Sequence, residues 1–146
     1  MYRRQIEAIL RLDSKTKHCF NGVFAMDELP IKPQNGCYVI NLDDHDEPGS
    51  HWVAVWCNKE RVEFMDPFGV PPLDKRCLMF LGKNVFFNTV KMQLLLSSAC
   101  GFYCTYFLIK RASGLSANTI IETLTRVDSD FVVKEYMYSR YKPVFT

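Results

Sequence analysis

The sequence has no hydrophobic run that approaches the length of a membrane span. Its unbroken apolar segments, such as WVAVWC at 52–57 and CLMFL at 77–81, are far shorter than the roughly 20 residues that a transmembrane helix needs. Residues 1–17 carry charges where a signal peptide would have an unbroken apolar stretch. We therefore expect an intracellular protein without a membrane partner.

The sequence also lacks a large net charge and a polar low-complexity tract. Eighteen Lys and Arg residues face 16 Asp and Glu residues, and the resulting charge of +2 is too small to indicate a nucleic-acid partner by itself. The chain has 146 residues, of which 48% are hydrophobic, so it is long enough to build one core. We expect a single domain over residues 1–146.

The sequence contains six cysteines, whose chemical state has to be inferred from their spacing. No pair has the CxxC spacing of a metal or redox motif, and nothing marks an oxidising compartment, so all six are interpreted as thiols. Four of them have no chemical partner in the pattern and are expected to be buried: Cys19, Cys37, Cys57 and Cys77.

Short runs of β-branched and aromatic residues, separated by polar turns, predict a sheet. The pattern is typical of an antiparallel meander, followed by a fourth strand. These strands are expected over 36–42, 51–57, 61–68 and 85–93, and the segment 20–36 is expected to be an ordered loop.

Helical patterns flank these strands. The helices are expected over 2–12, within 71–82, from 99 to about 114, over 116–125 and over 130–141. In the helix after Ala99, nearly every residue before Lys110 is apolar or small, on all faces of the helix. This pattern predicts a buried helix. The fold class is therefore α+β, with a central sheet packed by helices.

Cys100 is the candidate nucleophile because it lies at the start of the buried helix, where free N–H groups favour a thiolate. Gly101, the next residue, would let a substrate approach the backbone closely. Packing is the competing interpretation for Cys100 and Cys104, since free cysteine is often buried. A zinc site formed with His51 is a further alternative, but the pattern supplies no fourth ligand.

A cysteine nucleophile needs a base, and the base needs an orienting acid. His51 precedes the strand 52–57 and Asp66 ends the next one, so a hairpin would bring them together at one end of the sheet. His18 and His45 lie in charged turns and are interpreted as solvated.

The sequence resembles the adenovirus-type cysteine proteases in the order of four features. These are GSHWVAVW, then FMDPFG, then Gln93 seven residues before the CG pair at Cys100, and then Cys104 four residues after Cys100. The resemblance runs from about residue 19 to about 110. It implies a papain-like α+β fold, shared with the SUMO proteases, with His51 as base and Asp66 as orienting acid. Cys100 would be the nucleophile and Gln93 an oxyanion-hole donor.

The compact proteases of Maverick/Polinton-type DNA transposons and related viruses are the most similar in pattern. They imply cleavage of capsid or polyprotein precursors after small, glycine-containing sequences, and a location in the host nucleus and virion. We expect Trp52 to line the cleft, where it would favour small residues before the scissile bond, or else to pack in the core. Adenoviral members usually have glutamate where this chain has Asp66, and they are longer after the catalytic helix. Stimulation by DNA or by a peptide is therefore left open.

Other functions compete with an endopeptidase. An isopeptidase for ubiquitin-like modifiers is the main alternative, and an acetyltransferase would need a coenzyme A site that no basic or glycine-rich cradle indicates. A catalytically dead binding module would be expected to lack one of the four site residues. The segment 134–142 alternates bases with tyrosines, as a nucleic-acid surface does, but a solvated helix face is favoured. We expect no cofactor and no metal.

Overall fold

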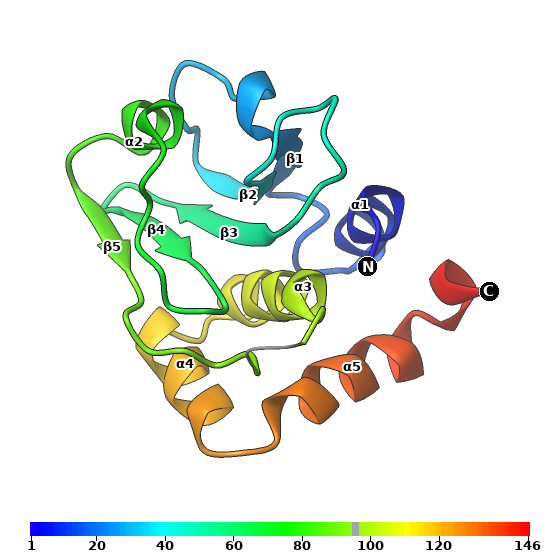
Figure 1. Ribbon diagram of the computed structural model, residues 1–146. Coiled ribbons are helices and arrows are strands. Elements are labelled where there is room, and N and C mark those ends of the chain that lie inside the picture. The colour runs from blue at the N-terminus through cyan, green and yellow to red at the C-terminus, as the bar shows by residue number, and fades with distance from the viewer. Residues whose placement is uncertain (95–96) are drawn as a thin grey trace.

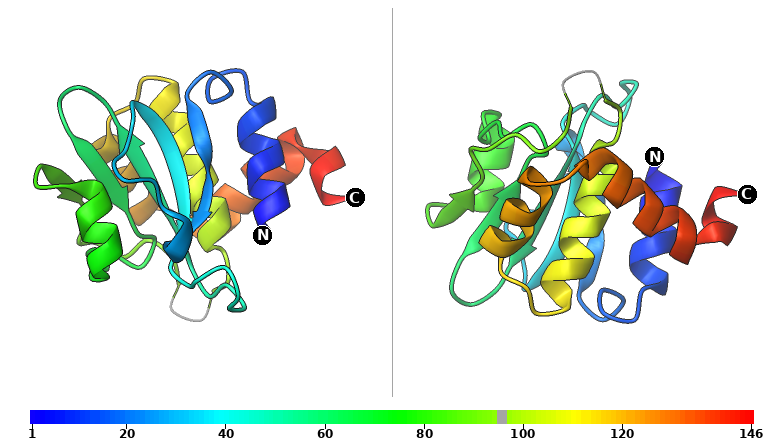
Figure 2. Two further views of the ribbon diagram at one scale, coloured as in Figure 1. Left: turned by 90° about the horizontal axis from the view of Figure 1, so that it is seen from above. Right: turned by 90° about the horizontal axis from the view of Figure 1, so that it is seen from below.

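The computed structural model describes residues 1–94 and 97–146. In this part of the chain a five-stranded mixed sheet is packed by helices on both faces (Figures 1 and 2). The strands are β1 (Phe20–Ala25), β2 (Gly36–Asn41), β3 (Trp52–Cys57), β4 (Val62–Met65) and β5 (Val85–Phe87). The helices are α1 (Arg3–Leu12), α2 (Lys75–Leu81), α3 (Cys100–Ala112), α4 (Ala117–Thr125) and α5 (Ser129–Arg140), with single 3-10 turns at Met26–Glu28 and Lys142–Phe145.

The strands lie side by side in chain order. β2, β3 and β4 form the predicted antiparallel meander, whereas β1 runs parallel to β2 and β5 runs parallel to β4. The predicted α+β class is therefore confirmed, and the sheet is mixed because its two outer strands run parallel to their neighbours. No described helix is long and apolar enough to cross a membrane.

Two predicted elements are wrong in part. The segment 20–36 was expected to be a loop, but its first residues form β1. Gly22 has φ +139°, and the register shifts between Phe20 and Gly22, which interrupts the alternation that identifies a strand. The strand expected over 85–93 ends at Phe87, because the Asn88 side chain bonds instead to the backbone of Asp66.

Alternate residues of the sheet face two separate cores. Cys37 and Val39 of β2 belong to the larger cluster, which α1, α3, α4 and α5 cover. Tyr38 and Ile40 point to the opposite face and pack with Phe80 and other residues of α2. This two-sided burial explains why every residue of β2 is buried.

The helix α3 lies against the larger core and is buried from Cys100 to Ile109, as its composition predicts. Near its exposed end, the Arg111 guanidinium Nε lies 2.8 Å from Oε1 of Glu63 on β4, whose side chain is almost inaccessible. Packing and this ion pair fix α3 against the sheet, and Cys100 is thereby held at one end of it.

Candidate active site

The β3–β4 hairpin brings His51 and Asp66 together. Ala54 pairs with Met65, so the residues just before β3 and just after β4 meet at the same end of the sheet. Nε2 of His51 lies 2.7 Å from Oδ1 of Asp66, and both side chains are largely buried. This is the approach that the hairpin register predicts.

The Asp66 carboxylate is itself held in place. Its Oδ1 also accepts the backbone N–H of Phe68 at 2.8 Å, and the Phe68 ring stacks on the His51 imidazole with centroids 4.8 Å apart. The plane of the imidazole is therefore fixed from its edge and from its face. Since Nε2 is used by Asp66, Nδ1 is the ring nitrogen left for a thiol.

Asn88 is a site residue that sequence reasoning missed. The backbone N–H of Asp66 donates to Asn88 Oδ1 at 2.9 Å, and Asn88 Nδ2 donates to the Asp66 carbonyl oxygen at 2.6 Å. Asn88 is 4% exposed, so this amide brackets the backbone of Asp66 inside the protein. No spacing or motif marks it; the only signal is a polar residue that ends the run VFF.

Cys100 is the first residue of α3 and is 8% exposed. Burial raises the pKa of its thiol, but a hydrogen bond with His51 and the backbone N–H groups of Trp52 and Gly101 outweigh burial, so the pKa lies below the ordinary 9.0. Burial lowers the pKa of His51, yet the hydrogen bonds to Asp66 and Cys100 raise it to about 9. Both shifts act in the direction that favours a thiolate beside an imidazolium.

Gln93 lies near this pair, in an irregular segment rather than at the end of a strand. Its side chain is 1% exposed, and its Nε2 donates to the carbonyl oxygen of Ser97 at 2.7 Å. Oε1 has no hydrogen-bond partner among the described residues. The amide therefore keeps one N–H hydrogen that this bond does not use.

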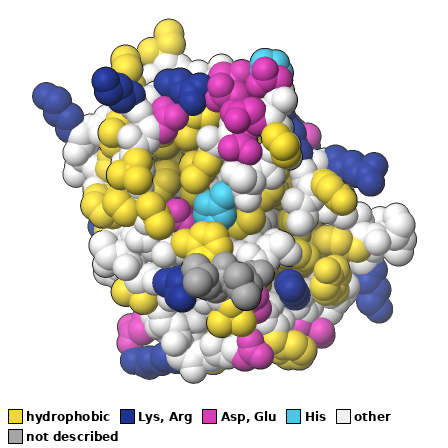
Figure 3. Space-filling view, in the orientation of Figure 1, with side chains coloured by type: hydrophobic (Ala, Val, Ile, Leu, Met, Phe, Trp, Pro, Cys, Tyr) yellow, Lys and Arg dark blue, Asp and Glu magenta, His cyan; other side chains and the backbone are white. Residues whose placement is uncertain are grey.

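A cleft of about 960 Å³ opens at these residues, which His51, Gln93 and Cys100 line together. One wall is the N-terminal segment, residues 1–4 with Glu7, and the other is the loop between β2 and β3. Figure 3 shows this face, where a histidine reaches the surface next to hydrophobic side chains and acidic side chains gather in a patch.

Trp52 both lines the cleft and packs on the core, so the two interpretations of this residue hold together. Its indole Nε1 donates to the Met1 carbonyl oxygen at 3.2 Å. Gly101 is buried beside it and is not among the residues that line the cleft. A Cβ atom added at Gly101 would lie 2.9 Å from Cβ of Met1. The N-terminal segment, and not a substrate as expected, is therefore what packs closely against Gly101 in this structure.

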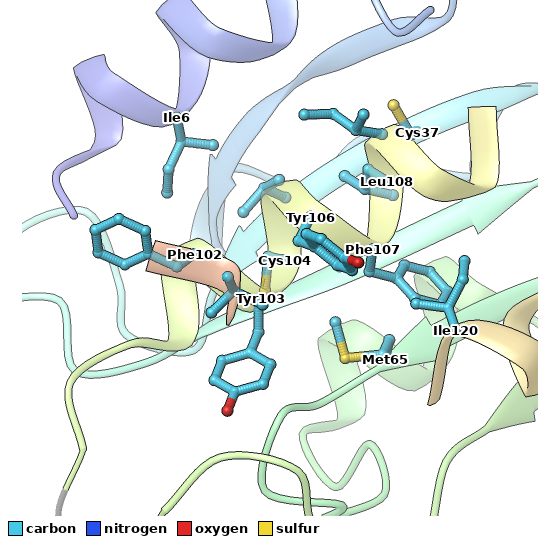
Figure 4. Close-up of a cluster of buried hydrophobic side chains, with 14 of the residues drawn as sticks. Ile6, Cys37, Met65, Phe102, Tyr103, Cys104, Tyr106, Phe107, Leu108 and Ile120 are labelled. Atoms are coloured by element: carbon cyan, nitrogen blue, oxygen red, sulfur yellow. The ribbon is translucent and has the colours of Figure 1, made fainter. Parts of the chain in front are cut away.

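Cys104 lies one turn deeper than Cys100 and is inaccessible, within the apolar cluster shown in Figure 4. Burial raises the pKa of its thiol well above 9.0. Among the described residues, the side chains close enough to share a metal ion are Asp44, Asp46 and Glu47 in the exposed loop after β2. The geometry gives no support to zinc held by Cys100 and Cys104.

The remaining thiols include one with a shifted pKa, because a hydrogen bond with Cys37 lowers the pKa of the Cys19 thiol to about 7. All six cysteines are free, and Cys37, Cys57 and Cys77 are buried as predicted, whereas Cys19 is only half-buried because it precedes β1 at the edge of the sheet. His18 is exposed. His45 pairs with Asp27 on the rim of the cleft, and that hydrogen bond raises the pKa of its imidazole.

The segment 134–142 lies mostly on α5. There the Arg140 guanidinium stacks 3.9 Å from the centroid of the Tyr136 ring, and Lys110 of α3 lies over the same ring. These contacts within the chain account for the alternation of bases and tyrosines.

No protein-family model matches this sequence, and no curated protein matches it. Among solved structures, the chain is similar to the crystal structure of the selenomethionine form of the ASFV pS273R protease, with a TM-score of 0.51 and 19% identity. The match covers 67% of this chain and 42% of that protein, so the chain spans less than half of its length. The fold is thus the papain-like one of the cysteine proteases, as predicted.

Proposed function

We propose that this protein is a cysteine endopeptidase in which Cys100 is the nucleophile, His51 the general base and acid, and Asp66 the orienting acid. The observation that carries the proposal is the 2.7 Å contact between the His51 imidazole and the Asp66 carboxylate, beside an open cleft that His51 and Cys100 line together. The protease fold supports it.

The reaction follows from the positions of these groups. The Cys100 thiolate attacks the carbonyl carbon of the scissile peptide bond, and the imidazolium of His51 gives its proton to the leaving amine. His51, now neutral, then removes a proton from water as that water attacks the thioester. The acid product leaves, and the thiolate and imidazolium are restored.

The oxyanion of the tetrahedral intermediate needs donors close to Cys100. The backbone N–H of Cys100 has no partner within α3 because Cys100 is the first residue of that helix. We assign the second donor to the unused N–H hydrogen of Gln93, whose side chain lines the same cleft. Two such donors stabilise the developing negative charge.

The substrate class rests on the resemblance in sequence to the adenovirus-type proteases and their compact transposon-encoded relatives. We propose cleavage after small, glycine-containing sequences in capsid or other structural polyproteins, in the host nucleus and the virion. The bulk of Trp52 in the cleft supports a preference for small residues.

The test is cleavage of Gly-Gly-containing peptides by the purified protein, compared with the variants Cys100→Ala and Cys104→Ala. The proposal requires cleavage that is lost in Cys100→Ala and retained in Cys104→Ala. Reaction only with probes that end in the C-terminus of a ubiquitin-like modifier would instead assign an isopeptidase. Transfer of an acetyl group from acetyl-coenzyme A without peptide cleavage would assign an acetyltransferase.

A further inference from the structure

We propose that Tyr103 and Ser129 are positioning residues that fix the position of the Gln93 side chain relative to Cys100. This inference rests on the role proposed above for Gln93 as an oxyanion donor. Neither residue touches the cleft, and each acts through the backbone of Met92.

The two hydroxyl groups form a buried cluster. The Tyr103 hydroxyl lies 2.5 Å from Oδ1 of Asp130, 2.6 Å from Oγ of Ser129 and 3.2 Å from the carbonyl oxygen of Met92. Ser129 Oγ also donates to that carbonyl at 3.0 Å. Both hydroxyl groups lie within hydrogen-bond distance of the Met92 carbonyl oxygen, and the Tyr103 hydroxyl also reaches the Asp130 carboxylate. In Figure 4 the Tyr103 hydroxyl points away from the apolar side chains around its ring.

The same backbone is held from its other side. The N–H groups of Met92 and Gln93 both donate to the carbonyl oxygen of Pro67, at 2.9 and 3.0 Å. Pro67 directly follows Asp66, the residue that holds His51. Residues 92–93 therefore lie between the carboxylate loop on one side and the ends of α3 and α5 on the other.

Tyr103 is well placed to set the position of Gln93 relative to the nucleophile. It lies three residues after Cys100 in the same helix, and residues at this spacing share a helix face. The Gln93 side chain has one hydrogen bond of its own, to Ser97, and its Oε1 has none among the described residues. Its amide is therefore oriented mainly by the backbone that Tyr103 and Ser129 hold.

The first test compares Tyr103→Phe with Tyr106→Phe. Both remove a hydroxyl from α3, but the Tyr106 hydroxyl makes no hydrogen bond within the described part of the chain. We expect Tyr103→Phe to lower kcat for peptide cleavage by roughly 10–100-fold, since a misplaced donor loses much of its effect. KM and the alkylation rate of Cys100 should stay near wild type, and Tyr106→Phe should change none of these.

A double-mutant cycle with Gln93→Ala separates positioning from a general structural effect. If Tyr103 acts through Gln93, Tyr103→Phe should reduce kcat little further in the Gln93→Ala background. An equal reduction in both backgrounds, or an unchanged kcat in folded Tyr103→Phe, would overturn the inference. Ser129→Ala should give the same result, and this variant replaces Tyr103→Phe in the test if Tyr103→Phe does not fold.

A spectroscopic arm does not depend on catalysis. In Cys100→Ala protein, Tyr103→Phe should shift or broaden the side-chain amide signals of Gln93 in ¹H–¹⁵N spectra, whereas Tyr106→Phe should leave them in place. Unchanged Gln93 signals would contradict the inference. Failure of wild-type protein to cleave peptides would reject the proposed function and leave this structural result to be decided separately.

Discussion

Nε2 of His51 lies 2.7 Å from Oδ1 of Asp66, although the two residues are 15 positions apart in the chain. The contact fixes which ring nitrogen faces the carboxylate and leaves Nδ1 for Cys100. It gives the two partners unequal roles, because the imidazole carries the proton and the carboxylate orients it.

Removing the base should cost more activity than weakening the orienting acid. We expect His51→Ala to abolish peptide cleavage, with a loss of at least roughly 10²–10⁴-fold in kcat. Asp66→Asn should reduce kcat by a smaller factor, because the amide can still contact the ring. His18→Ala is the matched control and should keep the wild-type rate, because His18 is exposed and does not line the cleft. A comparable loss in this control would count against the assignment of His51.

Alkylation of Cys100 should extend to lower pH than that of an ordinary thiol. Its pKa is lowered, so the thiolate forms below pH 9.0, and the His51 imidazolium that stabilises it is present until the pH rises through about 9. Cleavage should therefore decline at alkaline pH, as the imidazolium loses its proton. The pH dependence of iodoacetamide labelling, read by mass spectrometry, measures the pH range over which the Cys100 thiolate forms.

In His51→Ala the same labelling profile should move to higher pH, because burial then raises the Cys100 pKa without the imidazolium to oppose it. If the profile were identical with and without His51, the two groups would not form an ion pair.

Cys104 should behave as packing. Its thiol is inaccessible and its pKa is raised, so it should label far more slowly than Cys100 in folded protein. Cys104→Ala should lower the free energy of unfolding by about 1–3 kcal/mol, as a core truncation does, and should retain cleavage. Urea denaturation and peptide assays check both. Loss of cleavage in a folded Cys104→Ala protein would be inconsistent with this role.

Asn88→Ala should damage both stability and catalysis. It removes the buried amide that bonds the N–H and carbonyl of Asp66, which should cost about 1–3 kcal/mol and let the carboxylate move. Asn84→Ala is the matched control, since Asn84 is exposed and donates to the Glu60 carbonyl. Denaturation and kcat measured on both variants test this. If kcat in Asn88→Ala equalled that of the control, Asn88 would have no part in the site.

The parts of the site that were predictable from the sequence are those with local causes. The hairpin between β3 and β4 is short, so alternating residues and a polar turn were enough to place His51 beside Asp66. The start of α3 at Cys100 follows from the change to an all-round apolar pattern.

Other features depend on contacts between distant segments. β1 was missed because a glycine and a register shift interrupt its alternation, and its partner β2 follows a long connection. Asn88 and Tyr103 act through side-chain bonds to backbone atoms far along the chain, and no periodicity encodes such bonds. Gln93 was placed by resemblance alone, and its bond to Ser97 emerges only from the fold.

The central claim is that Cys100 forms a covalent acyl intermediate with help from His51. The most direct measurement is mass spectrometry of the intact protein and of its peptides after reaction with an acylating peptide probe ending in Gly-Gly. The account predicts one adduct, on Cys100, that forms in wild type and in Cys104→Ala and is lost in Cys100→Ala and strongly slowed in His51→Ala. An adduct on another cysteine, or one that forms on Cys100 at the same rate without His51, would contradict it.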